Sequence, residues 1–175
     1  MSYGEGALAP IYARGDIGVV LVSTGGGTSA VGWYHAVPGA SRVMLDSRVP
    51  YSREAVEEMV GPVEKSVSRD TAQALASWAY LRALSLLPKS PSTLIDSNRR
   101  AVGIACTAAL RTDRERRGDD HAWLATTTRE ETCVWRVDLS RWATREAQEQ
   151  QLSERLVVAL YGPAERVRGV WPVRS

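Results

Sequence analysis

The order of apolar and polar residues along the chain predicts an alternation of strands and helices. Short runs rich in Val, Ile and Ala, and one run in which apolar and polar residues alternate, are typical of strands. Apolar residues at helical spacing, bounded by Ser or Thr before and by Gly or Pro after, are typical of helices. Strands are predicted at 17–22, 42–49, 101–110, 121–128 and 132–139, and helices at 28–36, 52–61, 68–87 and 144–161.

This order of elements predicts one α/β domain. The domain spans 17–162, between a Gly- and Ala-rich N-terminal segment, 1–16, that we expect to be irregular and a C-terminal tail, 163–175. A parallel or mixed sheet covered by helices on both faces accommodates the pattern with short connections. Ligands of such sheets bind where the carboxyl ends of strands meet helix N-termini, which directs attention to residues 23–28.

Composition and charge exclude several functional classes. The chain has 175 residues, of which 44% are hydrophobic and 24% charged, with a formal net charge of +2. The Arg-rich segment 111–120 carries four arginines and four acids, so it does not form the basic stripe of a nucleic-acid-binding protein. No apolar run approaches the ~18 residues of a membrane span, and the first residues do not resemble a signal peptide. We therefore expect a cytoplasmic protein that binds neither nucleic acid nor a membrane.

Cysteine spacing gives no indication of a metal centre. Cys106 and Cys133 do not form a C-x-x-C pair, and no His cluster accompanies them. No sequence motif calls for a cofactor either. We expect neither a bound metal nor a cofactor.

The most distinctive local sequence is STGGGT, residues 23–28. It follows a predicted strand and opens a predicted helix, and main-chain N–H groups in that position bind anions. The motif lacks the Gly-Lys-Ser/Thr ending of a P-loop. It can hold a phosphate or a substrate oxygen, or it can be an ordinary turn.

Three short motifs together resemble the CinA C-terminal domain family. STGGGT, VPGAS (37–41) and PYSREA (50–55) are similar to the family's E-S-C-T-G-G, P-G-S-S and Y-S-N-x-x-K. Weaker similarity continues through VGIACT (102–107), RRGDDHAWLA (116–125) and the start of the last helix near Arg145. The resemblance covers about residues 17–161 and identifies the chain as a divergent member.

The resemblance implies an α/β fold, specifically a three-layer α/β/α sandwich with a mixed, mostly parallel sheet. It also implies the family's activity, hydrolysis of nicotinamide mononucleotide to nicotinic acid mononucleotide and ammonia. The family's Tyr matches Tyr51, and its later Arg matches Arg145. The family's serine falls on Thr24 without a gap, or on Ser23 if one residue is inserted. The family's lysine falls on Val56, which cannot activate a hydroxyl.

The first functional hypothesis is an amidohydrolase acting on nicotinamide mononucleotide or a related nucleotide amide. Thr24 or Ser23 attacks the amide, the glycine turn holds the oxyanion, and Tyr51 assists proton transfer. His121 is a candidate replacement for the missing base. The residues expected to contact substrate, beside the catalytic candidates, are Gly25, Gly26, Gly27, Thr28, Thr107, Arg114 and Arg117.

Two other hypotheses remain open. The domain can be a catalytically inactive module that binds a nucleotide or a phosphate, as the loss of the lysine favours. It can also be an interaction protein, because Trp123 and Trp135 lie on neighbouring predicted strands. The expected partners are a small nucleotide ligand and, through the helices, a second copy of the chain in a homodimer.

Overall fold

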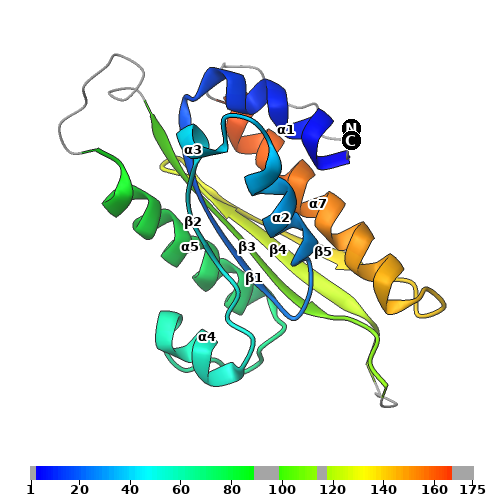
Figure 1. Cartoon of the computed structure of the whole chain (residues 1–175). Helices are drawn as coiled ribbons and strands as arrows, with labels where there is room; N and C mark the ends of the chain where they lie inside the picture. Colours follow the sequence, from blue (N-terminus) through cyan, green and yellow to red (C-terminus); the bar gives the residue numbers. More distant parts are fainter. Residues whose placement is uncertain (1–2, 89–98, 114–117, 167–175) are drawn as a thin grey trace.

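A five-stranded mixed sheet organises the described part of the chain, which comprises residues 3–88, 99–113 and 118–166 of this computed structural model (Figure 1). The strands are β1 (Ile17–Thr24), β2 (Met44–Arg48), β3 (Arg100–Ala109), β4 (His121–Thr127) and β5 (Thr132–Asp138). The helices are α1 (Tyr3–Arg14), α2 (Ser29–Ala36), α3 (Ala40–Val43), α4 (Arg53–Val60), α5 (Arg69–Leu86) and α7 (Arg145–Arg166). The predicted α/β class is confirmed.

The strand order is β2-β1-β3-β4-β5. β1 lies parallel to both β2 and β3, whereas β4 is antiparallel to both β3 and β5. Parallel and antiparallel pairings are thus equal in number among the described strands, whereas the resemblance implied a mostly parallel sheet. The short turn 128–131 between β4 and β5 fixes their antiparallel pairing, because a parallel connection needs a dozen or more residues.

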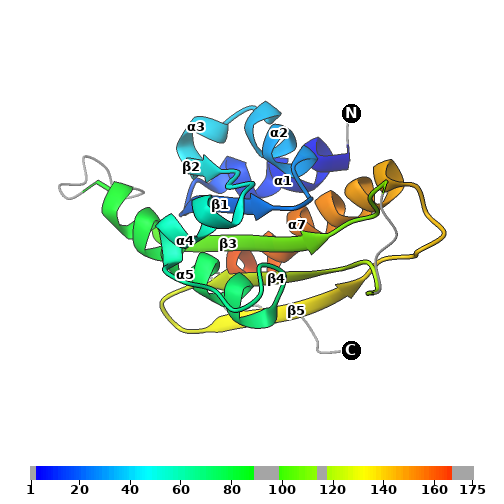
Figure 2. The same ribbon diagram turned by 90° about the horizontal axis from the view of Figure 1, so that it is seen from below.

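Each face of the sheet has its own apolar core, and β1 contributes to both. Ile17, Val19 and Leu21 pack with α1, α2 and α7, while Val20 and Val22 pack with α4 and α5. Successive side chains of a strand point to opposite faces, so a fully buried strand is apolar along its whole length. Figure 2 shows α5 and the α1–α2–α7 group on opposite sides of the strands.

Close packing brings α5 directly onto β3. A Cβ at Gly103 would lie 2.2 Å from the carbonyl oxygen of Ala76 and 2.3 Å from the main-chain nitrogen of Tyr80. Such distances are shorter than any real Cβ contact, so glycine is required where the helix backbone crosses the strand. This contact fixes α5 against the middle of the sheet.

The N-terminal segment was expected to be irregular from its sequence. In the structure it forms the helix α1. Leu8, Ile11 and Tyr12 from this helix are buried in the core shared with α2 and α7. The Tyr12 hydroxyl donates a hydrogen bond of 2.7 Å to the carbonyl of Tyr34. Glycines and Pro10 weaken the local helix signal, and burial of the apolar residues compensates for it.

The predicted end of the last helix at residue 161 is wrong, because α7 continues through Pro163 to Arg166. Pro163 and Ala164 are both buried, and Arg14 donates a hydrogen bond of 3.1 Å to the Ala164 carbonyl. Proline disrupts a helix interior by removing one donor, but packing against the core outweighs that loss here. Within the described residues, no helix is long and apolar enough to cross a bilayer.

Candidate functional site

The three glycines between β1 and α2 are closely packed against the protein itself, and backbone conformation favours glycine at Gly25 and Gly27. Gly25 and Gly27 have φ values of +78° and +77°, where residues with a Cβ are strained. A Cβ at Gly25 would lie 2.0 Å from the Ala108 carbonyl oxygen, and one at Gly26 or Gly27 would lie 2.6 Å from a leucine side chain. The turn is therefore packed between the end of β3 and helix α7.

The N-terminus of α2 holds a carboxylate that belongs to the chain. The Glu149 side chain, from α7, accepts hydrogen bonds from the main-chain nitrogens of Gly27 (2.7 Å) and Ser29 (2.9 Å). It also accepts hydrogen bonds from the hydroxyls of Thr28 (3.1 Å) and Ser153 (3.3 Å). Ser153 in turn accepts a hydrogen bond of 3.2 Å from the N–H of Ala30.

These contacts are those of an anion-binding site, and Glu149 occupies it. Free N–H groups and the helix dipole favour a negative charge at this position. Burial raises the pKa of Glu149, but the hydrogen bonds from Ser29, Gly27, Thr28 and Ser153 together outweigh that effect, so its pKa lies below the ordinary value. The carboxylate is therefore ionised at neutral pH.

The two candidate nucleophiles point to opposite faces of the sheet. Ser23 faces the α7 side, is fully buried, and donates a hydrogen bond of 2.5 Å to the Gly26 carbonyl. Thr24 faces the α5 side and is 7% exposed. Neighbouring residues of a strand alternate between faces, so one ligand position cannot serve both hydroxyls.

Thr24 lies beside Thr107, which is the residue opposite it in the β1–β3 register. Thr107 is fully buried, and its hydroxyl has no hydrogen-bond partner among the described residues. A buried polar group without a partner is uncommon and is costly to the folded state. Two hydroxyls thus stand together at the carboxyl ends of β1 and β3, on the face that α5 covers.

Among the described residues, none of the remaining catalytic candidates is hydrogen-bonded to Thr24. Val56, at the family's lysine position, is buried in the apolar core shared with α5. Tyr51 is 70% exposed. His121 is hydrogen-bonded through Nδ1 to the Asp119 carbonyl (2.8 Å), and Arg145 donates to the Arg111 carbonyl (2.8 Å). Arg114 and Arg117 lie outside the described residues.

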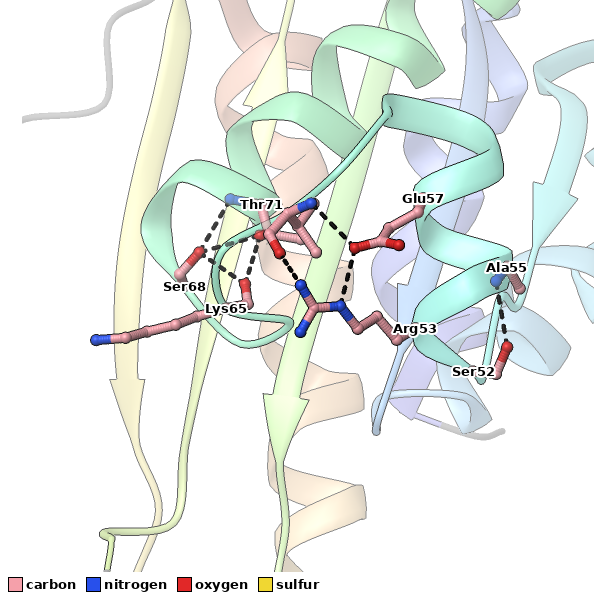
Figure 3. A network of polar contacts seen from close by, with 8 residues as sticks. Ser52, Arg53, Ala55, Glu57, Lys65, Ser68 and Thr71 are labelled. Atoms are coloured by element: carbon pink, nitrogen blue, oxygen red, sulfur yellow. Dashed lines mark hydrogen bonds and ion pairs between the residues drawn. The ribbon is translucent and has the colours of Figure 1, made fainter.

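The segment from Ser52 to Thr71 stabilises its own fold, as Figure 3 shows. Arg53 donates to Glu57 (2.8 Å) and to the Val63 carbonyl, and Glu57 also accepts from the Val63 N–H (3.2 Å). Ser52 and Ser68 are the N-caps of α4 and α5, as the sequence predicts.

The side chain of Lys65 extends away from the contacts drawn in Figure 3, whereas its main-chain carbonyl accepts hydrogen bonds from Ser68 (3.2 Å) and Thr71 (2.7 Å). Its ammonium group makes no contact in this network.

Sequence reasoning missed Glu149 and Ser153. They are four residues apart on α7, so they share one face of the helix, but nothing local distinguishes them from the other polar residues of that helix. Only the packing of α7 against α2 gives them a role. No group of three or more His, Cys, Asp and Glu side chains suited to a metal ion occurs among the described residues.

The fold is similar to solved structures of CinA-superfamily and competence/damage-inducible proteins. No family profile and no curated protein matches the sequence. A CinA superfamily protein from Escherichia coli superposes with a TM-score of 0.71 at 14% identity, over 90% of this chain and 88% of that one. A competence/damage inducible protein from Agrobacterium tumefaciens gives 0.68 at 18% identity, over 92% and 98%. A CinA superfamily protein from Klebsiella pneumoniae gives 0.69 at 16% identity, over 97% and 100%. At these identities the comparison confirms the resemblance at the level of the fold.

Proposed function

We propose that this chain is a non-catalytic ligand-binding module with the CinA fold. Its ligand is a nucleotide amide of the nicotinamide mononucleotide class, bound without hydrolysis. The proposal includes the three-layer α/β/α architecture implied by the resemblance, which the two apolar cores on opposite faces of the sheet support.

The observation that carries the proposal is the Glu149 carboxylate at the N-terminus of α2. An amidohydrolase needs donors for the oxyanion that forms when a hydroxyl attacks the amide. The N–H groups of Gly27 and Ser29 are instead bonded to Glu149, whose negative charge would also repel an oxyanion.

The surroundings of Thr24 among the described residues support the same conclusion. A threonine hydroxyl is a weak nucleophile unless a base takes its proton. Val56 stands where the family has lysine, and within the described ranges no ionisable side chain is hydrogen-bonded to Thr24.

Binding itself is supported by Thr24 and Thr107. The unpartnered hydroxyl of Thr107 would gain a hydrogen bond from a ligand carboxamide or ribose hydroxyl placed at the carboxyl ends of the two strands. This position is at the carboxyl ends of two parallel strands, where ligands of α/β sheets bind.

The second candidate is the amidohydrolase with Thr24 as nucleophile. The observation in its favour is that Thr24 is 7% exposed, whereas Ser23 is fully buried and is bonded to the glycine turn. In this alternative Tyr51 or His121 assists proton transfer, and the chain forms homodimers in the cytoplasm, as expected from the sequence.

One experiment separates the two candidates. Ammonia release from nicotinamide mononucleotide is measured alongside binding of the same nucleotide by thermal shift. We expect stabilisation without ammonia. Thr107→Val should reduce the thermal shift, while Thr132→Val, on the exposed edge strand, should leave it unchanged. Ammonia release that is lost in Thr24→Val would refute the proposal and establish the hydrolase.

A further inference from the structure

A cavity lies at the opposite end of β3 from Thr107. It encloses about 210 Å³ between the start of β3, the turn after β4, and the outer half of α5. In the β1–β3 register, Arg100 is opposite Ile17 at the first position of the ladder, and Thr107 is opposite Thr24 at its last. The two locations are separated by the length of the strands.

Arginine side chains dominate the charge of this cavity. Arg99, Arg100 and Arg129 line it, and Glu130 is the acidic residue among its described lining. Arg100 and Glu130 are 3.6 Å apart with side chains 48% and 54% exposed, so their pairing is weak. The described lining therefore has an excess of positive charge, and the mutual repulsion of the guanidinium groups would be relieved by a bound anion.

The geometry of the lining favours a phosphate over a single carboxylate. Guanidinium groups bind phosphate oxygens through paired, charge-assisted hydrogen bonds, and several can share the oxygens of one phosphate. Arg99 is held in position by its hydrogen bond to the Arg42 carbonyl, so part of the site is already ordered.

The other walls of the cavity suit an organic group attached to that phosphate. Tyr80 and Leu84, from α5, line it together with Val102 from β3. A half-buried tyrosine ring beside arginines can pack against a flat heterocycle while its hydroxyl stays accessible.

We infer that this cavity binds the phosphate of a small organic phosphate monoester, such as a nucleoside monophosphate. The inference is independent of the ligand proposed at Thr24, because the two locations share no residue.

Calorimetric titration at constant ionic strength tests the site, with adenosine monophosphate, inorganic phosphate and adenosine as probes. We expect saturable binding of the nucleotide, weaker binding of inorganic phosphate and none of adenosine. Arg100→Ala and Arg129→Ala should each raise the Kd of the nucleotide about tenfold, by removing one charged hydrogen-bonding partner. Both side chains are exposed, so the variants should unfold at the wild-type temperature.

Arg141→Ala is the matched control, because Arg141 is an exposed arginine in the loop after β5 and does not line the cavity. Its Kd should equal that of the wild type. The proposal is overturned if the nucleotide does not bind at concentrations up to about 10 mM. It is also overturned if both cavity variants bind the nucleotide with the wild-type Kd, or if inorganic phosphate binds and the nucleotide does not.

Discussion

Replacing Glu149 by alanine tests whether the internal carboxylate secures the glycine turn. The substitution removes an acceptor from two main-chain N–H groups and two hydroxyls, at distances of 2.7 to 3.3 Å. Each lost hydrogen bond is worth about 1 kcal/mol, but water can reach this half-buried site and replace part of the loss. We therefore expect Glu149→Ala to lower the free energy of unfolding by about 2 kcal/mol, at the upper end of the effect of losing a helix N-cap.

Urea unfolding followed by tryptophan fluorescence measures this difference. With an m value of about 2 kcal/mol/M, the midpoint should fall by about 1 M. Glu154→Ala is the matched control on the same helix, since Glu154 accepts only an exposed hydrogen bond from Gln150 (2.8 Å) and should cost less than about 0.5 kcal/mol. Equal midpoints for the two variants would show that the contacts of Glu149 do not stabilise the turn.

Three further predictions concern the same core of the molecule. The pKa of Glu149 is lower in the folded state, so its contribution to stability is present above the unfolded pKa and is lost as pH falls through the folded pKa. The difference in unfolding free energy between wild type and Glu149→Gln should therefore shrink below about pH 4, as acid unfolding would measure. Gly25→Ala should lower the free energy of unfolding by more than about 3 kcal/mol, because its Cβ would lie 2.0 Å from the Ala108 carbonyl oxygen. Gly32 in α2 has open space around it, so Gly32→Ala should raise the melting temperature measured by circular dichroism. Burial raises the pKa of the Cys106 thiol, so iodoacetamide under native conditions should label Cys133 while leaving Cys106 unmodified, as mass spectrometry of the digest would show.

The structure identifies what packs against the glycine turn. In the sequence, three consecutive glycines indicate that another group lies close to the backbone, and that group could belong to a ligand or to the protein itself. In the structure the partners are β3 and α7, together with the carboxylate of Glu149. The proposed ligand site is on the other face of β1, where Thr24 and Thr107 lie side by side.

Elements with local sequence signals could be predicted from the sequence. The strand predicted at 17–22 and the helix predicted at 68–87 depend on neighbours within a few residues, and both predictions are confirmed. The similarity of STGGGT and VPGAS to family motifs also indicated the correct fold. Each motif is short, so it can be recognised in the sequence without knowledge of distant contacts.

Features that depend on contacts between residues far apart in the sequence could be recognised only in the folded structure. α1 is stable because Leu8 and Tyr12 are buried against helices more than twenty residues away, which no local pattern records. Glu149 lies more than one hundred residues beyond Gly27, and its place at the N-terminus of α2 follows from the packing of two helices on one face of the sheet. Local propensity is encoded in adjacent residues, whereas a site assembled from both ends of the chain exists only once the whole core has formed.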